Sequence, residues 1–158
     1  IRLVTGKKDA RENKRISVTM RTPGNDEELA LGFLFTEGII SGNQDLSGIS
    51  FPRENIVEVE LRTEVKTDLQ KLERNFYTTS SCGICGKSSI DAIRTVKEIS
   101  PGGENISISY RTLCSLPDQL RQAQPVFDQT GGLHASAIFD LSGKLLFDRE
   151  DEIGRAHV

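Results

Sequence analysis

One glycine-rich stretch with two cysteines, residues 78–88 (TTSSCGICGKS), limits most strongly how this chain can fold. Ile84 is its only large apolar side chain, so the stretch cannot build a hydrophobic core. A glycine follows each cysteine and opens turn conformations that other residues avoid. We therefore expect an exposed, mobile loop within one domain of 158 residues, between an N-terminal strand and helix part (1–75) and a sheet and helix part (89–158).

A helix is predicted directly after this loop, because Ser88 or Ser89 can cap it and apolar residues then recur at every third position. The apolar residues are Ile90, Ile93, Val96 and Ile99. This helix would place both cysteines near its N-terminus and beside Lys87. The positive end of the helix dipole and the lysine charge both favour the thiolate over the thiol. Since the thiolate is the nucleophile and the metal ligand, the loop is suited to sulfur chemistry or to metal binding.

The composition is that of an ordinary globular protein and excludes several classes of function. With 36% hydrophobic residues, 27% charged residues and a net charge of −3, the chain gives no reason to expect a nucleic-acid partner. Residues 1–15 are locally basic, which favours a solvated edge over a phosphate-binding arm. No apolar run is long enough to span a membrane, and no signal peptide is visible. The odd number of cysteines, three, adds to these grounds for expecting a reducing cytoplasm.

The first half of the chain predicts strands and one helix. Alternating β-branched residues predict a strand over 16–20, and a second strand is predicted over 56–61. Between them, Asn25 or Asp26 is expected to cap a helix that ends at Gly38. Its buried face is predicted from the apolar spacing as Leu29, Ala30, Phe33 and Leu34. Gly32 within this helix would be explained by close packing against a neighbouring element.

Two further segments predict a connection and a short strand. Residues 41–55 are polar and carry glycine and serine, so they predict a connection, with Ile49 and Phe51 as anchors. After a turn at 101–103, alternation over 106–110 predicts a short strand or an extended segment.

The C-terminal third predicts a helix followed by a hairpin. Leu116 and Pro117 indicate a helix start, and Pro125 is expected to kink or end that helix. Two strands, 134–140 and 144–148, are joined by a short turn, as in a β-hairpin. Strands mixed with helices predict an α/β sandwich with a mixed sheet.

Three kinds of chemistry fit the pair Cys82 and Cys85. A structural zinc site would need two more ligands, usually from a second closely spaced pair, and Cys114, His134 and His157 are scattered singles. A dithiol oxidoreductase would need a thioredoxin-like strand-to-helix context. A carrier of transferable sulfur needs a thiolate on a loop that can visit two partners, which the glycines suit best. Cys114 itself is expected to be a buried small hydrophobe.

Three blocks resemble one known family. Residues 20–40 (MRTPGNDEELALGFLFTEGII) are similar to the N-terminal signature of the formate dehydrogenase accessory sulfurtransferases, the FdhD family. The loop 80–86 (SSCGICG) resembles that family's cysteine motif, and 127–137 (FDQTGGLHASA) resembles its third block. The blocks occur in the family's order.

The resemblance implies a fold and a function. The fold would be a cytidine-deaminase-like three-layer α/β sandwich with a mixed sheet, usually in a homodimer. A cysteine desulfurase would load sulfur onto the loop as a persulfide, with Cys82 as the carrier and Cys85 as a supporting or alternative thiol. The sulfur would then pass to the molybdenum or tungsten of a bis-pyranopterin guanine dinucleotide cofactor and so activate formate dehydrogenase. No permanently bound metal is expected.

The same resemblance offers residues for the guanine nucleotide, each with a plainer structural alternative. Thr22 could line the pocket or belong to a helix cap. Gly131 and Gly132 could offer N–H groups to a phosphate or form a simple turn. His134 could be structural, and Arg155 could pair with a pyrophosphate.

The end of the sequence departs from the family pattern. An extra Glu152 shifts His157 by one place, and we expect the family's C-terminal portion to be missing from this sequence. A non-catalytic molybdenum-cofactor chaperone and a zinc-binding CxxC module remain as alternatives.

Overall fold

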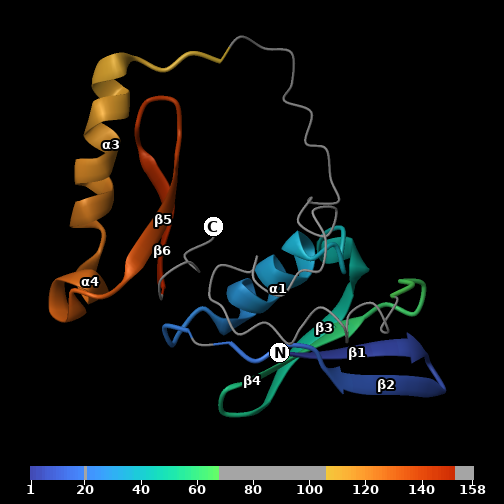
Figure 1. Ribbon diagram of the computed structural model, residues 1–158. Helices are drawn as coiled ribbons and strands as arrows, with labels where there is room; N and C mark the ends of the chain where they lie inside the picture. The colour runs from blue at the N-terminus through green and yellow to red at the C-terminus, as the bar shows by residue number, and fades with distance from the viewer. Residues whose placement is uncertain (20, 68–105, 152–158) are drawn as a thin grey trace, which may run out of the picture. The chain divides into compact units, whose positions relative to one another are not determined.

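The computed structural model describes residues 1–19, 21–67 and 106–151, which divide into two compact units (Figure 1). Of the described residues, the first unit comprises 1–19 and 23–67, and the second comprises 21–22 and 106–151. The expectation of a single domain stays a prediction, as do the cytidine-deaminase-like topology and the three layers.

The first unit contains a four-stranded mixed sheet, so the predicted mixed α/β class is confirmed. The strand order is β2-β1-β4-β3, with β1 and β4 parallel and the two outer pairs antiparallel. The strands are β1 (Arg2–Lys7), β2 (Ala10–Arg15), β3 (Leu46–Arg53) and β4 (Ile56–Leu61).

One face of this sheet carries the core, and α1 (Asp26–Thr36) packs against it (Figure 1). The predicted strand over 56–61 is confirmed as β4, where burial alternates with the period of two that a half-covered sheet requires. Ala30 and Leu34 of α1 are fully buried. The buried core consists of Leu3, Ile16, Ala30, Leu34, Ile39, Ile40, Val57, Val59 and Leu61.

The helix prediction is largely confirmed, with one correction. Three acidic residues occupy the first turn, and Gly38 follows the helix end with a left-handed φ of 68°. Asn25 takes the N-cap position, but its side chain makes no capping bond. Among the described residues, a Cβ built on Gly32 meets no atom within 4 Å, so they give no support to the packing explanation for this glycine.

The predicted strand over 16–20 is wrong, since residues 16–19 have no regular structure and the strands lie earlier, in the basic run. The strand β2 was missed in the basic run because it is an edge strand without apolar alternation, whose charged side chains pair across the sheet. Arg11 contacts the Glu60 carboxylate at 2.9 Å and donates to the Leu61 carbonyl.

The predicted connection 41–55 is also wrong, because it contains a 3-10 turn, η1 (Asn43–Asp45), and the whole of β3. Its glycine, serines and proline hid a strand that exposes most of its length. Ile49 packs against the core as expected, whereas Phe51 is exposed.

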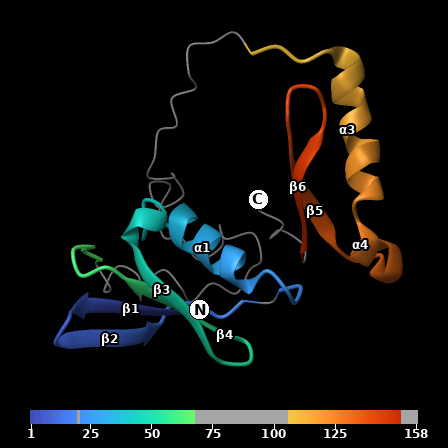
Figure 2. The ribbon, with the colours of Figure 1, turned by 180° about the vertical axis from the view of Figure 1, so that it is seen from behind.

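The second unit combines two helices with a two-stranded hairpin. Its elements are α3 (Tyr110–Gln122), α4 (Pro125–Thr130), β5 (His134–Phe139) and β6 (Leu145–Asp151). The predicted hairpin is confirmed, and α3 contacts both of its strands (Figure 2). Asp140 orders the turn by accepting backbone N–H bonds from Ser142 and Lys144.

The predicted start of α3 at Leu116 is wrong, because the helix begins six residues earlier, where Ser109 Oγ accepts the Thr112 N–H at 3.0 Å. Pro117 therefore lies inside the helix. Residues 106–109 form no strand, although Ser109 is extended. Pro125 does end the first helix, since it is the first residue of α4.

Several predictions fall outside the described residues: the cysteine loop with Cys82 and Cys85, the helix 88–99, the turn 101–103, and Arg155. Within the ranges that are described, no helix is both long and apolar enough to cross a membrane.

Candidate functional site

Four of the proposed nucleotide-binding residues lie in the second unit, and the structure brings two of them to one end of its hairpin. His134 opens β5 and pairs with Asp151, the last residue of β6. Asp151 in turn accepts a hydrogen bond from the backbone N–H of Thr22. Thr22 and His134 are remote in sequence, yet both adjoin Asp151.

Asp151 is the functional candidate that the sequence reasoning missed. Its side chain is largely buried, with 7% of the residue exposed, and its Oδ1 lies 2.7 Å from Thr22 N. A buried carboxylate needs such a partner, because burial of an unpaired charge is costly. The available signal was a pair of acids, Glu150 and Asp151, at the end of a strand that is otherwise only half buried.

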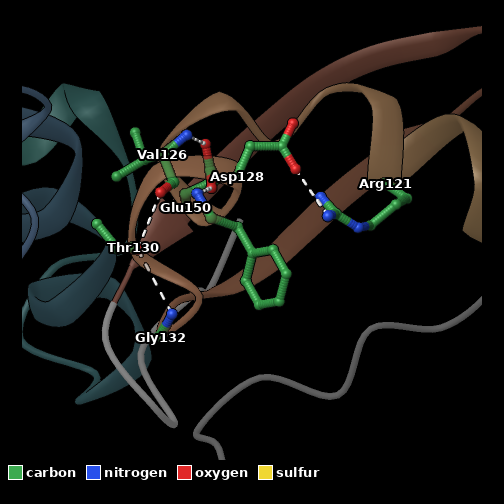
Figure 3. Close-up of polar contacts among 7 residues, drawn as sticks. Arg121, Val126, Asp128, Thr130, Gly132 and Glu150 are labelled. Carbon is green, nitrogen blue, oxygen red and sulfur yellow. Dashed lines mark hydrogen bonds and ion pairs between the residues drawn. The ribbon is translucent and has the colours of Figure 1, made fainter.

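Glu150 binds a different segment, the start of α4, because neighbouring side chains of a strand point to opposite faces. Its two carboxylate oxygens accept the N–H groups of Val126 at 3.0 Å and Phe127 at 2.7 Å (Figure 3). These are the donors that an N-cap side chain would satisfy, and Gln124 at the cap position makes no such bond. The negative charge also suits the N-terminus of α4.

The Gly131 and Gly132 turn follows α4 directly. Gly131 has a left-handed φ of 67° and donates its N–H to the Phe127 carbonyl at 2.7 Å. Gly132 N lies 3.4 Å from Thr130 Oγ1, which itself donates to the Val126 carbonyl (Figure 3). Both N–H groups thus bond within the chain as a helix C-cap, and their use by a phosphate stays a prediction.

Arg121, near the end of α3, contacts two residues of α4. Its guanidinium contacts the Asp128 carboxylate at 2.7 Å and lies 4.6 Å from the centre of the Phe127 ring (Figure 3). The Gly131 and Gly132 turn follows α4 and leads into His134.

The remaining candidates are exposed or undescribed. His134 is exposed at the start of β5. Cys114 is exposed on α3, so the expectation that it is buried is wrong. Across residues 1–19, 21–67 and 106–151, no three His, Cys, Asp or Glu side chains gather to hold a metal ion.

Comparison with known proteins gives a consistent result. Residues 10–157 match the FdhD/NarQ family. The chain is 46% identical over 149 residues to a protein from Mycolicibacterium paratuberculosis, covering 89% of this chain and 54% of that protein. It is 41% identical over 139 residues to one from Sulfurisphaera tokodaii, covering 88% and 50% respectively. Both relatives are named "Sulfur carrier protein FdhD".

The fold agrees with these matches. A candidate formate dehydrogenase accessory protein from Desulfotalea psychrophila superposes with a TM-score of 0.53 at 16% identity, over 96% of this chain and 61% of that structure. This mixed α/β chain belongs to the FdhD/NarQ family, which confirms the resemblance of its three sequence blocks. It spans about half the length of the curated relatives it matches.

Proposed function

We propose that this chain acts as a sulfur carrier in the maturation of formate dehydrogenase. It receives sulfur from a cysteine desulfurase as a persulfide on Cys82 or Cys85. The sulfur then goes to the molybdenum or tungsten of a bis-pyranopterin guanine dinucleotide, which is cargo and not a resident cofactor. The observation that carries this proposal is the match to relatives named as sulfur carriers, at over 40% identity, in a chain that has the CGIC pair.

The chemistry needs only two thiols. The Cys82 thiolate attacks the outer sulfur of the donor's persulfide, so one S–S bond forms while another breaks and the donor leaves as a thiolate. This step is neutral in redox. In release, the Cys85 thiolate attacks the Cys82 sulfur, so a Cys82–Cys85 disulfide forms and the bond to the carried sulfur breaks. The carried sulfur departs as sulfide, reduced by the two electrons that the pair of cysteines loses. A thiol reductant then restores the pair.

The guanine nucleotide of the cargo is assigned to Thr22, Gly131, Gly132, His134 and Arg155. The arrangement of Thr22 and His134 around Asp151 supports a common pocket at this end of the second unit. We further propose that the protein works as a homodimer, which sedimentation analysis tests directly.

The test is sulfur loading. The protein is incubated with a cysteine desulfurase and ³⁵S-labelled cysteine, and bound label that dithiothreitol releases is counted. The Cys82→Ala/Cys85→Ala variant should lose the label, whereas Cys114→Ala, which removes an exposed thiol from α3, should keep it. Retention of the label by the double variant would refute the assigned site.

Two other outcomes identify the alternatives. A double variant that still matures formate dehydrogenase to full activity would indicate a non-catalytic cofactor chaperone that uses the loop only for docking. Stoichiometric zinc, lost in the same variant, would indicate a CxxC metal module.

A further inference from the structure

The end of β6 positions a segment that is far away in the sequence. Asp151, largely buried, accepts the N–H of Thr22 across 129 residues of chain. We infer that Asp151 is a positioning residue for guanine-nucleotide binding, acting by fixing Thr22 beside His134. This inference rests on the proposed function and goes beyond it, because it assigns a role to a residue outside the proposed ligand set.

The local sequence explains why Thr22 needs this anchor. Pro23 follows it, has no N–H, and restricts the residue before it to extended conformations. Of Thr22 and Pro23, only Thr22 has a backbone N–H, so this is the backbone donor through which the pair of residues can be held in place. When Asp151 takes that N–H, the hydroxyl and the carbonyl of Thr22 remain for a ligand.

The pairing of the hairpin explains why His134 shares this site. His134 and Asp151 are directly opposed in an antiparallel pair, so their side chains lie on the same face. That face is opposite the one from which Glu150 reaches α4. The exposed His134 and the anchored Thr22 consequently flank one buried carboxylate.

The experiment measures the Kd for guanosine diphosphate by calorimetry on the full-length protein. Asp151→Ala removes the acceptor and should raise the Kd by about tenfold or more, the equivalent of one lost hydrogen bond to a charged group. Asp151→Asn keeps an acceptor oxygen in the same place and should stay within about threefold of the native value. Labelled-sulfur loading should be unchanged in both variants.

A destabilised control separates positioning from general damage. Val59→Ala removes buried atoms from the core of the first unit, where the side chain is fully buried, and should leave the Kd unchanged. The inference is overturned if Asp151→Ala binds the nucleotide as the native protein does, if Val59→Ala weakens binding equally, or if Asp151→Ala also loses sulfur loading. Native protein that loads sulfur but binds no nucleotide would instead refute the nucleotide part of the proposed function, and this inference with it.

Discussion

Glu150 Oε2 lies 2.7 Å from the backbone nitrogen of Phe127, so the penultimate residue of strand β6 caps the N-terminus of the neighbouring helix α4. The other oxygen of the same carboxylate accepts from Val126. A short helix such as α4, with six residues, depends on contacts of this kind because it cannot be stable in isolation.

Replacement of Glu150 by alanine should lower the free energy of unfolding by about 1–2 kcal/mol, since two N–H groups lose their acceptor. The free energy of unfolding of Glu150→Gln should lie between those of the native protein and Glu150→Ala, because the glutamine amide has a single acceptor oxygen. Chemical denaturation measures the difference. Glu54→Ala, which removes an exposed acid in the turn between β3 and β4, is the control. Equal stability of the native protein and Glu150→Ala would contradict the cap.

The contact of Arg121 with Asp128 should contribute little despite its short distance. Both side chains are more than half exposed, at 52% and 59%, and exposed ion pairs contribute about 0–1 kcal/mol. A double-mutant cycle with Arg121→Met and Asp128→Asn should therefore give a coupling below about 1 kcal/mol that falls in high salt. Arg111→Met, at an exposed position on the same helix, is the matched control. A coupling above about 2 kcal/mol would show that the pair is desolvated.

Gly143 and Gly131 should respond differently to alanine. Both have positive φ, 86° and 67°, so both variants carry backbone strain of about 1 kcal/mol. A Cβ on Gly143 would also lie 2.6 Å from Thr112 Cγ2 of α3, whereas one on Gly131 meets no described atom within 4 Å. Gly143→Ala should be the more destabilising of the two in thermal unfolding. Equal losses would indicate that α3 does not pack against the hairpin turn.

Asp140 should make the hairpin turn sensitive to acid. The Ser142 hydroxyl and then the Lys144 N–H hold the pKa of this carboxyl below its ordinary value of 3.8. A pKa depressed by folding gives stability that is present above 3.8 and is lost as the pH falls through the folded value. Carbon-detected NMR titration should show the low pKa, and Ser142→Ala should move it back toward 3.8. A native titration at the ordinary value would contradict the bonding in this turn.

The sequence predicted the elements whose burial follows a simple period. The strand over 56–61 and the helix ending at Gly38 combine regular apolar spacing with a clear end signal, and the hairpin has a clear turn. By contrast, four of the six residues of β2 are charged, as suits a sheet edge, and β3 is mostly exposed. Neither strand carries the alternation from which strands are recognised.

The candidate site was predictable only where its residues belong to a local sequence pattern. Family-like blocks indicated Thr22 and His134, but a block says nothing about what holds its residues in place. Asp151 acts through a backbone N–H that is remote in sequence, and such a contact leaves no local pattern. The early start of α3 was missed because Pro117 looked like a first-turn proline, while the cap is made by Ser109.

The parallel neighbours β1 and β4 impose an order on synthesis. Leu3 pairs with Val59, so β1 can pair with β2 early but cannot complete its pairing until β4 has been synthesised. The β5–β6 hairpin, joined by a short turn, can close as soon as its own residues are made. A nascent chain halted before residue 56 would therefore expose the apolar side of β1 and α1 to chaperones.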